Sequence, residues 1–336
     1  MDHLEVPDSV KQSIPDDVIL AYWDYYSADP EKYKQMLRLH QSFEREIWFA
    51  GGAWTWLGFA PLNEYSISTM QAADYGCRSQ GIRNVLITLW GDDGSDCSKF
   101  AVLPALFYAA ELYRGNRDRT EIEAKFQSLF QISFSDFLLL DLANHVGTPK
   151  DEQTDPCKYL LYADPFMGLT DSTIEPGESS VYRTYSDRLQ TMVSHPQFGY
   201  LFRTQKALCD VLFLKSELGL RIHHAYAAHS REELTACVHD METLDGLYRT
   251  FYLEFRAQWM RDCKPQGFEI QDYRLGGLIQ RNRHCLEILR DYITGKISAI
   301  PELEEPQLDF SGNGFEFEKK HRYFNEFPKM ISAGLL

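Results

Sequence analysis

Three short apolar runs, each followed by a helix-like stretch, constrain the fold of this 336-residue chain more than any other feature. The runs are residues 18–23, 46–50 and 84–90. The stretches with helical periodicity are residues 30–43, 66–80 and 97–113. Continuous apolar runs are typical of parallel strands that are covered on both faces. The order βαβαβα therefore predicts a parallel sheet of three strands within residues 1–115.

Three parallel strands are too few to close a barrel or to form a well-protected open sheet. We therefore expect the unit in residues 1–115 to be incomplete. An incomplete sheet exposes strand edges and apolar faces where further strands belong. The isolated chain is accordingly predicted to associate with itself or to be poorly soluble.

From about residue 119 onward, helical periodicity replaces the strand-like runs. Polar loops interrupt it at residues 146–157 and 170–179. Long helices are predicted over residues 180–194, 197–228, 230–262 and 274–295. Residues 116–336 are thus expected to form a helical domain, either a bundle or a pair of long antiparallel helices.

The charge and the cysteines narrow the class of protein. A formal net charge of -15 argues against nucleic acid as a partner, because an acidic chain repels phosphate backbones. No run is apolar enough to span a membrane, and the first residues lack a signal-peptide pattern. The seven cysteines are odd in number and form no C-x-x-C pair, which predicts free, mostly buried thiols in a reducing compartment. We expect a cytoplasmic protein.

No cofactor or metal motif occurs in the chain. The sequence contains no His-Glu-x-x-His, no P-loop and no Gly-x-Gly-x-x-Gly. His223, His224 and His229 share one helical stretch, but their spacing does not suit a metal ion. We expect no cofactor and no metal.

The tryptophans cluster near the ends of the predicted strands. Five of the six lie on the second strand or at strand ends: Trp23, Trp48, Trp54, Trp56 and Trp90. Active sites of βα barrels lie at the carboxyl ends of the strands. Gly and Asp flank these tryptophans, and they allow close backbone approach and accept hydrogen bonds from hydroxyls. The cluster indicates a binding site; the alternative is that the tryptophans fill a core.

These segments resemble a known family. Residues 22–26 (YWDYY), 51–56 (GGAWTW) and 89–92 (LWGD), in this order, resemble strands six to eight of family-20 glycoside hydrolases, the β-N-acetylhexosaminidases. Residues 158–165 (KYLLYADP) and 329–334 (KMISAG) extend the resemblance to a bacterial branch with a helical C-terminal domain. The resemblance implies the C-terminal part of a (β/α)8 TIM barrel, about three βα units in residues 1–115, followed by a helical domain at 116–336.

The resemblance also implies roles for particular residues. Trp90 resembles a wall of the sugar pocket. Asp92 resembles the acid that binds sugar hydroxyls, although the family typically has Glu there. Trp23, with Trp54 or Trp56, would line the pocket around the acetamido group. Tyr25 is the candidate to hold the acetamido oxygen; its alternative role is that of an ordinary barrel-rim tyrosine.

The implied activity is exo-hydrolysis of terminal β-linked GlcNAc or GalNAc, a step of carbohydrate metabolism. The family uses substrate-assisted retaining catalysis, in which the acetamido oxygen of the substrate attacks C1. Its catalytic Asp-Glu pair follows strand four, in a His-x-Gly-Gly-Asp-Glu-like context. This chain resembles the family from about strand six, so we expect it to contain no catalytic residue.

One segment superficially resembles the missing motif. Residues 145–152 (HVGTPKDE) end in an Asp-Glu pair, but they lie in a polar, Pro-containing loop with no strand immediately before them. We interpret Glu152 as a solvated loop carboxylate.

Other functions stay open at this point. The chain could be a catalytically inactive sugar-binding protein, a helical interaction module, or part of another glycosidase family with a similar barrel. An Asp-Glu pair upstream of this chain would favour the enzyme, and an apolar patch on the helices would favour the interaction module. The expected partner is a glycan that contains N-acetylhexosamine.

Overall fold

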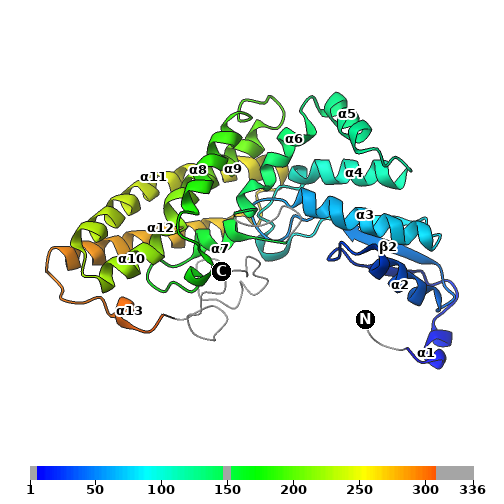
Figure 1. Ribbon diagram of the computed structural model, residues 1–336, viewed down its shortest axis with the longest axis horizontal. Coiled ribbons are helices and arrows are strands. Elements are labelled where there is room, and N and C mark those ends of the chain that lie inside the picture. The colour runs from blue at the N-terminus through cyan, green and yellow to red at the C-terminus, as the bar shows by residue number, and fades with distance from the viewer. Residues whose placement is uncertain (1–5, 147–152, 308–336) are drawn as a thin grey trace. The chain divides into compact units, whose positions relative to one another are not determined.

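The computed structural model describes residues 6–146 and 153–307 (Figure 1). Contacts divide the chain into two compact units. The sheet unit holds the described residues up to Thr55, together with Leu62–Trp90 and Val102–Leu138. The helical unit holds Trp56–Pro61, Gly91–Ala101 and the described residues from Leu139 onward. The segments that follow the second and third strands therefore pack with the helices.

The three predicted strands are present, and they form one parallel sheet in the order β1-β2-β3. Their bounds are β1 Leu20–Trp23, β2 Ile47–Gly52 and β3 Val85–Thr88. Trp23 is the register partner of Ala50, and Gly52 is the partner of Thr88. The prediction of a three-stranded parallel sheet is confirmed. Such a sheet does not by itself establish a barrel, so the partial TIM barrel stays a prediction.

The helices of the sheet unit begin and end at recognisable signals. They are α1 Asp8–Ser13, α2 Pro30–Gln41, α3 Asn63–Ser79, α4 Leu103–Tyr113, α5 Arg119–Phe130 and α6 Phe134–Phe137. Helix α2 starts with Pro30, and the side chain of Asp29 accepts a hydrogen bond from the backbone N–H of Glu31. Proline in the first turn and an acidic N-cap both favour a helix start at this point.

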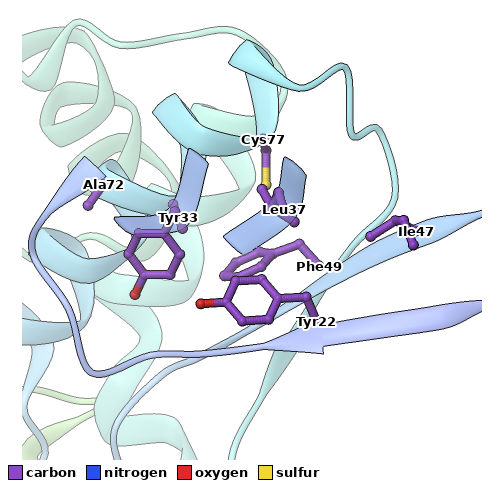
Figure 2. Close-up of a cluster of buried hydrophobic side chains, with 8 residues drawn as sticks. Tyr22, Tyr33, Leu37, Ile47, Phe49, Ala72 and Cys77 are labelled. Carbon is purple, nitrogen blue, oxygen red and sulfur yellow. The ribbon is translucent and has the colours of Figure 1, made fainter. Parts of the chain in front are cut away.

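One face of the sheet carries the core of this unit (Figure 2). Helices α2 and α3 pack there against side chains from β1 and β2. The buried residues are Tyr22, Tyr33, Leu37, Ile47, Phe49, Ala72, Ala73 and Cys77. Strand residues alternate between faces, so Ala21, Trp23 and Leu86 lie on the opposite face, and all three are exposed.

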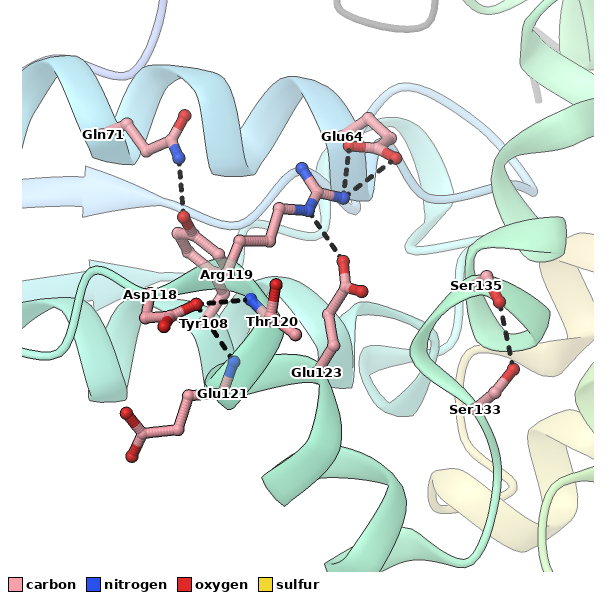
Figure 3. Close-up of polar contacts among 10 residues, drawn as sticks. All are labelled: Glu64, Gln71, Tyr108, Asp118, Arg119, Thr120, Glu121, Glu123, Ser133 and Ser135. Carbon is pink, nitrogen blue, oxygen red and sulfur yellow. Dashed lines mark hydrogen bonds and ion pairs between the residues drawn. The ribbon is translucent and has the colours of Figure 1, made fainter.

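Polar contacts fasten α5 to α3 and cap its start (Figure 3). Arg119 pairs with Glu123 at 2.7 Å and with Glu64 of α3 at 3.5 Å. The Asp118 carboxylate accepts hydrogen bonds from the backbone N–H groups of Thr120 and Glu121. Capping of this kind satisfies backbone donors that the first turn leaves unpaired.

The helix expected at residues 97–113 is shorter than predicted. A 3-10 turn, η2, occupies Lys99–Val102, and α4 begins at Leu103 with Pro104 in its first turn. Proline has no backbone N–H to donate to a preceding turn, so the α-helix starts there instead of extending further back.

Helices make up the helical unit, and the described residues beyond Thr88 hold no strand. They are α7 Pro156–Tyr162, α8 Ser179–Gln190, α9 Gly199–Lys215, α10 Leu218–Ala227, α11 Arg231–Asp262, α12 Phe268–Ile293 and α13 Pro301–Glu304. Three short 3-10 segments are also present: η1 Asp92–Gly94 and η3 Leu138–Asn144 precede α7, and η4 Asp171–Thr173 connects α7 to α8. Helices α11 and α12 pack against each other, as do α8, α9 and α11 in succession. The prediction of a helical domain is confirmed.

The predicted helix over 180–194 ends earlier, at Gln190, and two further predictions differ more from the structure. The helix expected over 197–228 is two helices, because Glu217 leaves helical geometry and its carboxylate accepts a hydrogen bond from the Ser179 backbone N–H. Helix α12 begins at Phe268 and not at residue 274, since the buried Phe268 ring packs against Phe255 and Trp259.

The seven cysteines are free thiols, and six of them are buried. Burial raises the pKa of the Cys157 thiol to about 12, which is typical of an inert core cysteine. None of the helices in the described ranges is long and apolar enough to cross a membrane.

Candidate functional site

The carboxyl ends of the three strands lie at one edge of the sheet, because the strands are parallel. Backbone hydrogen bonds continue past the strand ends. The N–H of Asp24 donates to the oxygen of Ala50 at 3.1 Å, and the N–H of Ala53 donates to Thr88 at 2.9 Å. The residues that follow each strand are therefore held in register at this edge.

Large aromatic side chains at this edge are exposed, among them Trp23, Tyr26 and Trp90. Trp23 ends β1 and is 60% exposed, and Trp90 lies two residues past β3 and is 47% exposed. The Thr55 hydroxyl donates to the Trp90 backbone oxygen at 2.9 Å, which holds the backbone at Trp90. Exposed indole faces at strand ends suit the apolar C–H faces of a sugar ring.

The ring of Tyr25, which is buried, contacts both Trp23 and Trp54. The Tyr25 ring centroid is 5.8 Å from that of Trp23 and 5.7 Å from that of Trp54. Trp54 is only 1% exposed, and its indole N–H donates to the Tyr25 backbone oxygen at 3.0 Å. Its backbone N–H donates to the Ser66 hydroxyl at 2.9 Å. Trp54 thus supports Tyr25 from within the unit.

Asp24 is a buried carboxylate at this edge that the sequence analysis did not single out. It accepts hydrogen bonds from the Tyr22 hydroxyl at 2.8 Å and from the Tyr26 backbone at 2.9 Å, and Lys32 lies 3.0 Å away. These contacts hold the turn that carries Tyr25. A polar residue directly after an apolar strand was the available signal in the sequence.

A hollow of about 610 Å³ lies beside β1 in the sheet unit. Trp23, Asp24, Tyr26 and Lys32 contribute to its lining, so it reaches the carboxyl end of the strand. Its other lining residues are mainly apolar: Val6, Val10, Ile14, Leu20, Ala21, Tyr22, His40 and Phe43. Within the described residues, β1 pairs with β2 alone, so its other edge borders this hollow.

The two remaining predicted site residues belong to the helical unit. Trp56 is buried at 5% exposure, and Asp92 is exposed at the start of η1. The ammonium group of Lys99 lies near Gly91, the residue before Asp92: a Cβ atom on Gly91 would be 3.6 Å from Nζ of Lys99. Burial lowers the pKa of Lys99, while nearby thiols and the Asp92 carboxylate oppose that shift.

The structure thus brings Trp23, Tyr25 and Trp54 into ring contact and places Trp90 at the same sheet edge. Glu152 and residues 329–334 lie outside the described residues. No group of three His, Cys, Asp or Glu side chains within residues 6–146 and 153–307 is arranged to hold a metal ion.

Comparison with known proteins identifies a family to which the chain belongs. The family model described as the Glycoside Hydrolase 20C C-terminal domain matches residues 135–322, more than half of the chain. A search of curated proteins finds no match. Among solved structures, a GH138 enzyme described as targeting pectin rhamnogalacturonan II is 10% identical, with a TM-score of 0.41. The alignment covers 81% of this chain and 53% of that structure, so this chain spans about half of its length. So low a score supports no conclusion.

Proposed function

Because the chain belongs to the family of the Glycoside Hydrolase 20C C-terminal domain, we propose that it forms the C-terminal part of an exo-β-N-acetylhexosaminidase. The enzyme hydrolyses terminal β-linked GlcNAc or GalNAc by substrate-assisted retaining catalysis. Residues 1–115 contribute strands six to eight of a (β/α)8 barrel, and residues 116–336 form the helical domain. The matched region and the three parallel strands support this proposal.

The main support for a sugar-binding site is the exposure of Trp23 and Trp90 at the carboxyl edge of a parallel sheet. Indole faces bind the apolar faces of a pyranose and exclude water from them. Trp23 lies against Tyr25, whose hydroxyl is the proposed donor to the acetamido oxygen. Trp54 supports Tyr25.

Asp92 is the proposed acceptor for sugar hydroxyls, since a carboxylate accepts several hydrogen bonds at once. Trp56 is the remaining proposed contact near the acetamido group. The catalytic Asp-Glu pair is supplied from outside this chain, from the part of the barrel that precedes it. That pair protonates the leaving oxygen and orients the acetamido group, and the residues of this chain bind and orient the sugar.

The test is hydrolysis of a chromogenic β-GlcNAc substrate by this chain and by the same chain extended upstream to a full barrel. We expect activity only in the extended protein. In that protein, Trp23→Ala and Trp90→Ala should each lower kcat/KM at least about tenfold, because each removes a stacking surface. Tyr75→Ala is the matched control, since Tyr75 is also an exposed aromatic residue of the sheet unit but lies on α3.

Other outcomes would contradict the proposal in different ways. Activity in this chain alone would show that the general acid is present here, and Glu152 would be the first residue to mutate. Sugar binding without hydrolysis in the extended protein would favour a catalytically inactive sugar-binding protein. Neither binding nor hydrolysis would favour a helical interaction module.

A further inference from the structure

Two segments that leave the sheet, Trp56–Pro61 after β2 and Gly91–Ala101 after β3, pack as part of the helical unit. They carry Trp56 and Asp92, two of the proposed sugar contacts. Lys158 of α7 contacts both segments, and it is 1% exposed. The proposed sugar site does not include this lysine, which leaves its burial to be explained.

The ammonium group of Lys158 forms an ion pair with the second segment, Gly91–Ala101. Its Nζ atom lies 2.8 Å from Oδ2 of Asp96, and both side chains are almost completely buried. Gln271 of α12 donates to Oδ1 of Asp96 at 2.6 Å and to the Gly94 backbone oxygen at 3.3 Å. Gly94 has a φ of +112°, and a Cβ atom there would lie 2.3 Å from a guanidinium nitrogen of Arg274. A side chain at position 94 would therefore collide with Arg274 and would be strained in the backbone.

The aliphatic part of Lys158 lies against the first segment. A Cβ atom on Gly58 would be 3.0 Å from Cβ and 3.5 Å from Cδ of Lys158, so only a glycine allows this approach without displacement. The adjacent carbonyl groups are held as well. Gln205 donates to the Phe59 oxygen at 2.6 Å, and Asn144 donates to the Ala60 oxygen at 3.0 Å.

A buried ion pair is weak evidence for stability, because desolvation of the two charges offsets their attraction. Loss of one partner is nevertheless strongly destabilising, because it leaves a buried charge without compensation. Here one side chain joins two segments, so a movement of either segment disturbs the contacts of the other.

We propose that Lys158 is a positioning residue that couples the segments after β2 and β3 and thereby fixes Trp56 and Asp92 for sugar binding. This inference rests on the proposed function. The helical domain then has a direct part in sugar recognition, through the loops that it holds.

The first test measures hydrogen exchange of the backbone amides in the full chain. In Lys158→Met, backbone amides in both segments should exchange about tenfold faster than in the wild type, because the side chain that contacts both segments has lost its ion pair. Lys215→Met is the matched control. Lys215 is another buried lysine of the helical unit, and it donates to the Ala163 backbone oxygen. Its loss should leave exchange in both segments unchanged.

A double variant, Asp96→Asn with Lys158→Met, keeps the test decisive if the single variant does not fold. This variant removes both buried charges, and it still lacks the ion pair between Lys158 and Asp96. Fast exchange in both segments is therefore again expected. Unchanged exchange, or equally faster exchange in Lys215→Met, would overturn the proposal.

The second test is kinetic and uses the protein extended upstream. Lys158→Met should raise KM for the chromogenic β-GlcNAc substrate about tenfold, and Lys215→Met should not. Faster exchange with an unchanged KM would overturn the positioning role. A wild-type protein without hydrolysis would contradict the proposed function, and hydrogen exchange would still decide whether Lys158 couples the two segments.

Discussion

The sheet unit and the helical unit satisfy the same physical requirements in different ways. A helix pairs its backbone groups within itself, so the long helices α11 and α12 need only bury their apolar stripes. A strand needs neighbours on both sides and cover on both faces. In the sheet unit only one face carries the core of α2 and α3, and Trp23 and Leu86 stay exposed on the other.

This difference indicates which kind of substitution should destabilise each unit. The helical unit contains the buried Lys158–Asp96 ion pair and a set of aromatic rings in mutual contact: Phe251, Phe255, Trp259 and Phe268. Within the residues that the structure describes, the sheet unit has one edge of β1 without a neighbouring strand, and it has exposed aromatic side chains. Both are features of a surface that binds something else.

The largest effect is expected from matched core truncations. Phe49→Ala in the sheet unit and Phe251→Ala in the helical unit each remove a fully buried ring, so each should cost about 3–5 kcal/mol of unfolding free energy. Each loss should fall on the unit that contains the residue. Urea unfolding followed by hydrogen exchange in both units measures this. Equal losses in both units from either variant would show that they unfold as one.

A pH effect on stability is expected in the helical unit. Burial raises the pKa of Asp171 to about 6, and the nearby Lys215 charge opposes that shift. The folded chain then binds this proton more tightly than the unfolded chain, so stability falls as pH rises from about 4 to about 6. Asp171→Asn should remove this dependence and raise the unfolding free energy at pH 7 by about 3 kcal/mol.

Unfolding of the Asp171→Asn variant should therefore be compared with the wild type at pH 4 and pH 7. The asparagine oxygen can still accept the hydrogen bond that Gln307 donates to Asp171 at 2.8 Å. A variant that loses stability equally at both pH values would show that the carboxylate is charged and stabilising in the folded chain.

Helix caps give a smaller, paired effect. Ser230 caps α11 through a hydrogen bond from the Glu233 backbone at 3.3 Å, and Asp118 caps α5. Ser230→Ala and Asp118→Ala should each cost about 1 kcal/mol, and each should loosen only its own unit. Thermal unfolding and local exchange rates measure both. A cost well above this range in one unit would show that its cap has a further role.

The smallest effect on stability is expected from Leu86→Lys, a substitution that should clearly reduce self-association of the chain. Leu86→Lys changes an exposed side chain on the uncovered sheet face, so stability should shift by no more than about 0.5 kcal/mol. Self-association in sedimentation should nevertheless decrease, because a charge on this face opposes edge-to-edge and face-to-face pairing. Leu253→Lys, on the exposed surface of α11, is the control and should leave association unchanged. A wild-type chain that sediments as a monomer would contradict the idea of an open sheet.

Much of the secondary structure could be predicted from the sequence. Among the described residues, the three apolar runs and the helical periodicity located the strands β1, β2 and β3 and most helices, since period and length differ between the two kinds of element. The break at Glu217 could not be predicted, because the local sequence continues to favour a helix there. It depends on a hydrogen bond to Ser179, a residue distant in sequence.

The candidate site was predictable in part. The tryptophans at the strand ends were visible in the sequence, but their exposure was not. Trp23 and Trp54 look alike there, yet Trp23 is 60% exposed and Trp54 is 1% exposed. The difference arises because the segment from Trp54 to Ser66 folds back and packs the second indole under Tyr25.

The sequence by itself determined the elements, their order and the residue types at the strand ends, because these depend on local periodicity and propensity. Only the tertiary structure decided which partners meet. Lys158 and Asp96 are an unremarkable lysine and aspartate in the sequence, and folding brings them to 2.8 Å in a buried environment. Local patterns specify which face of an element is apolar, whereas the pairing of buried charges depends on the packing of segments that are far apart in the chain.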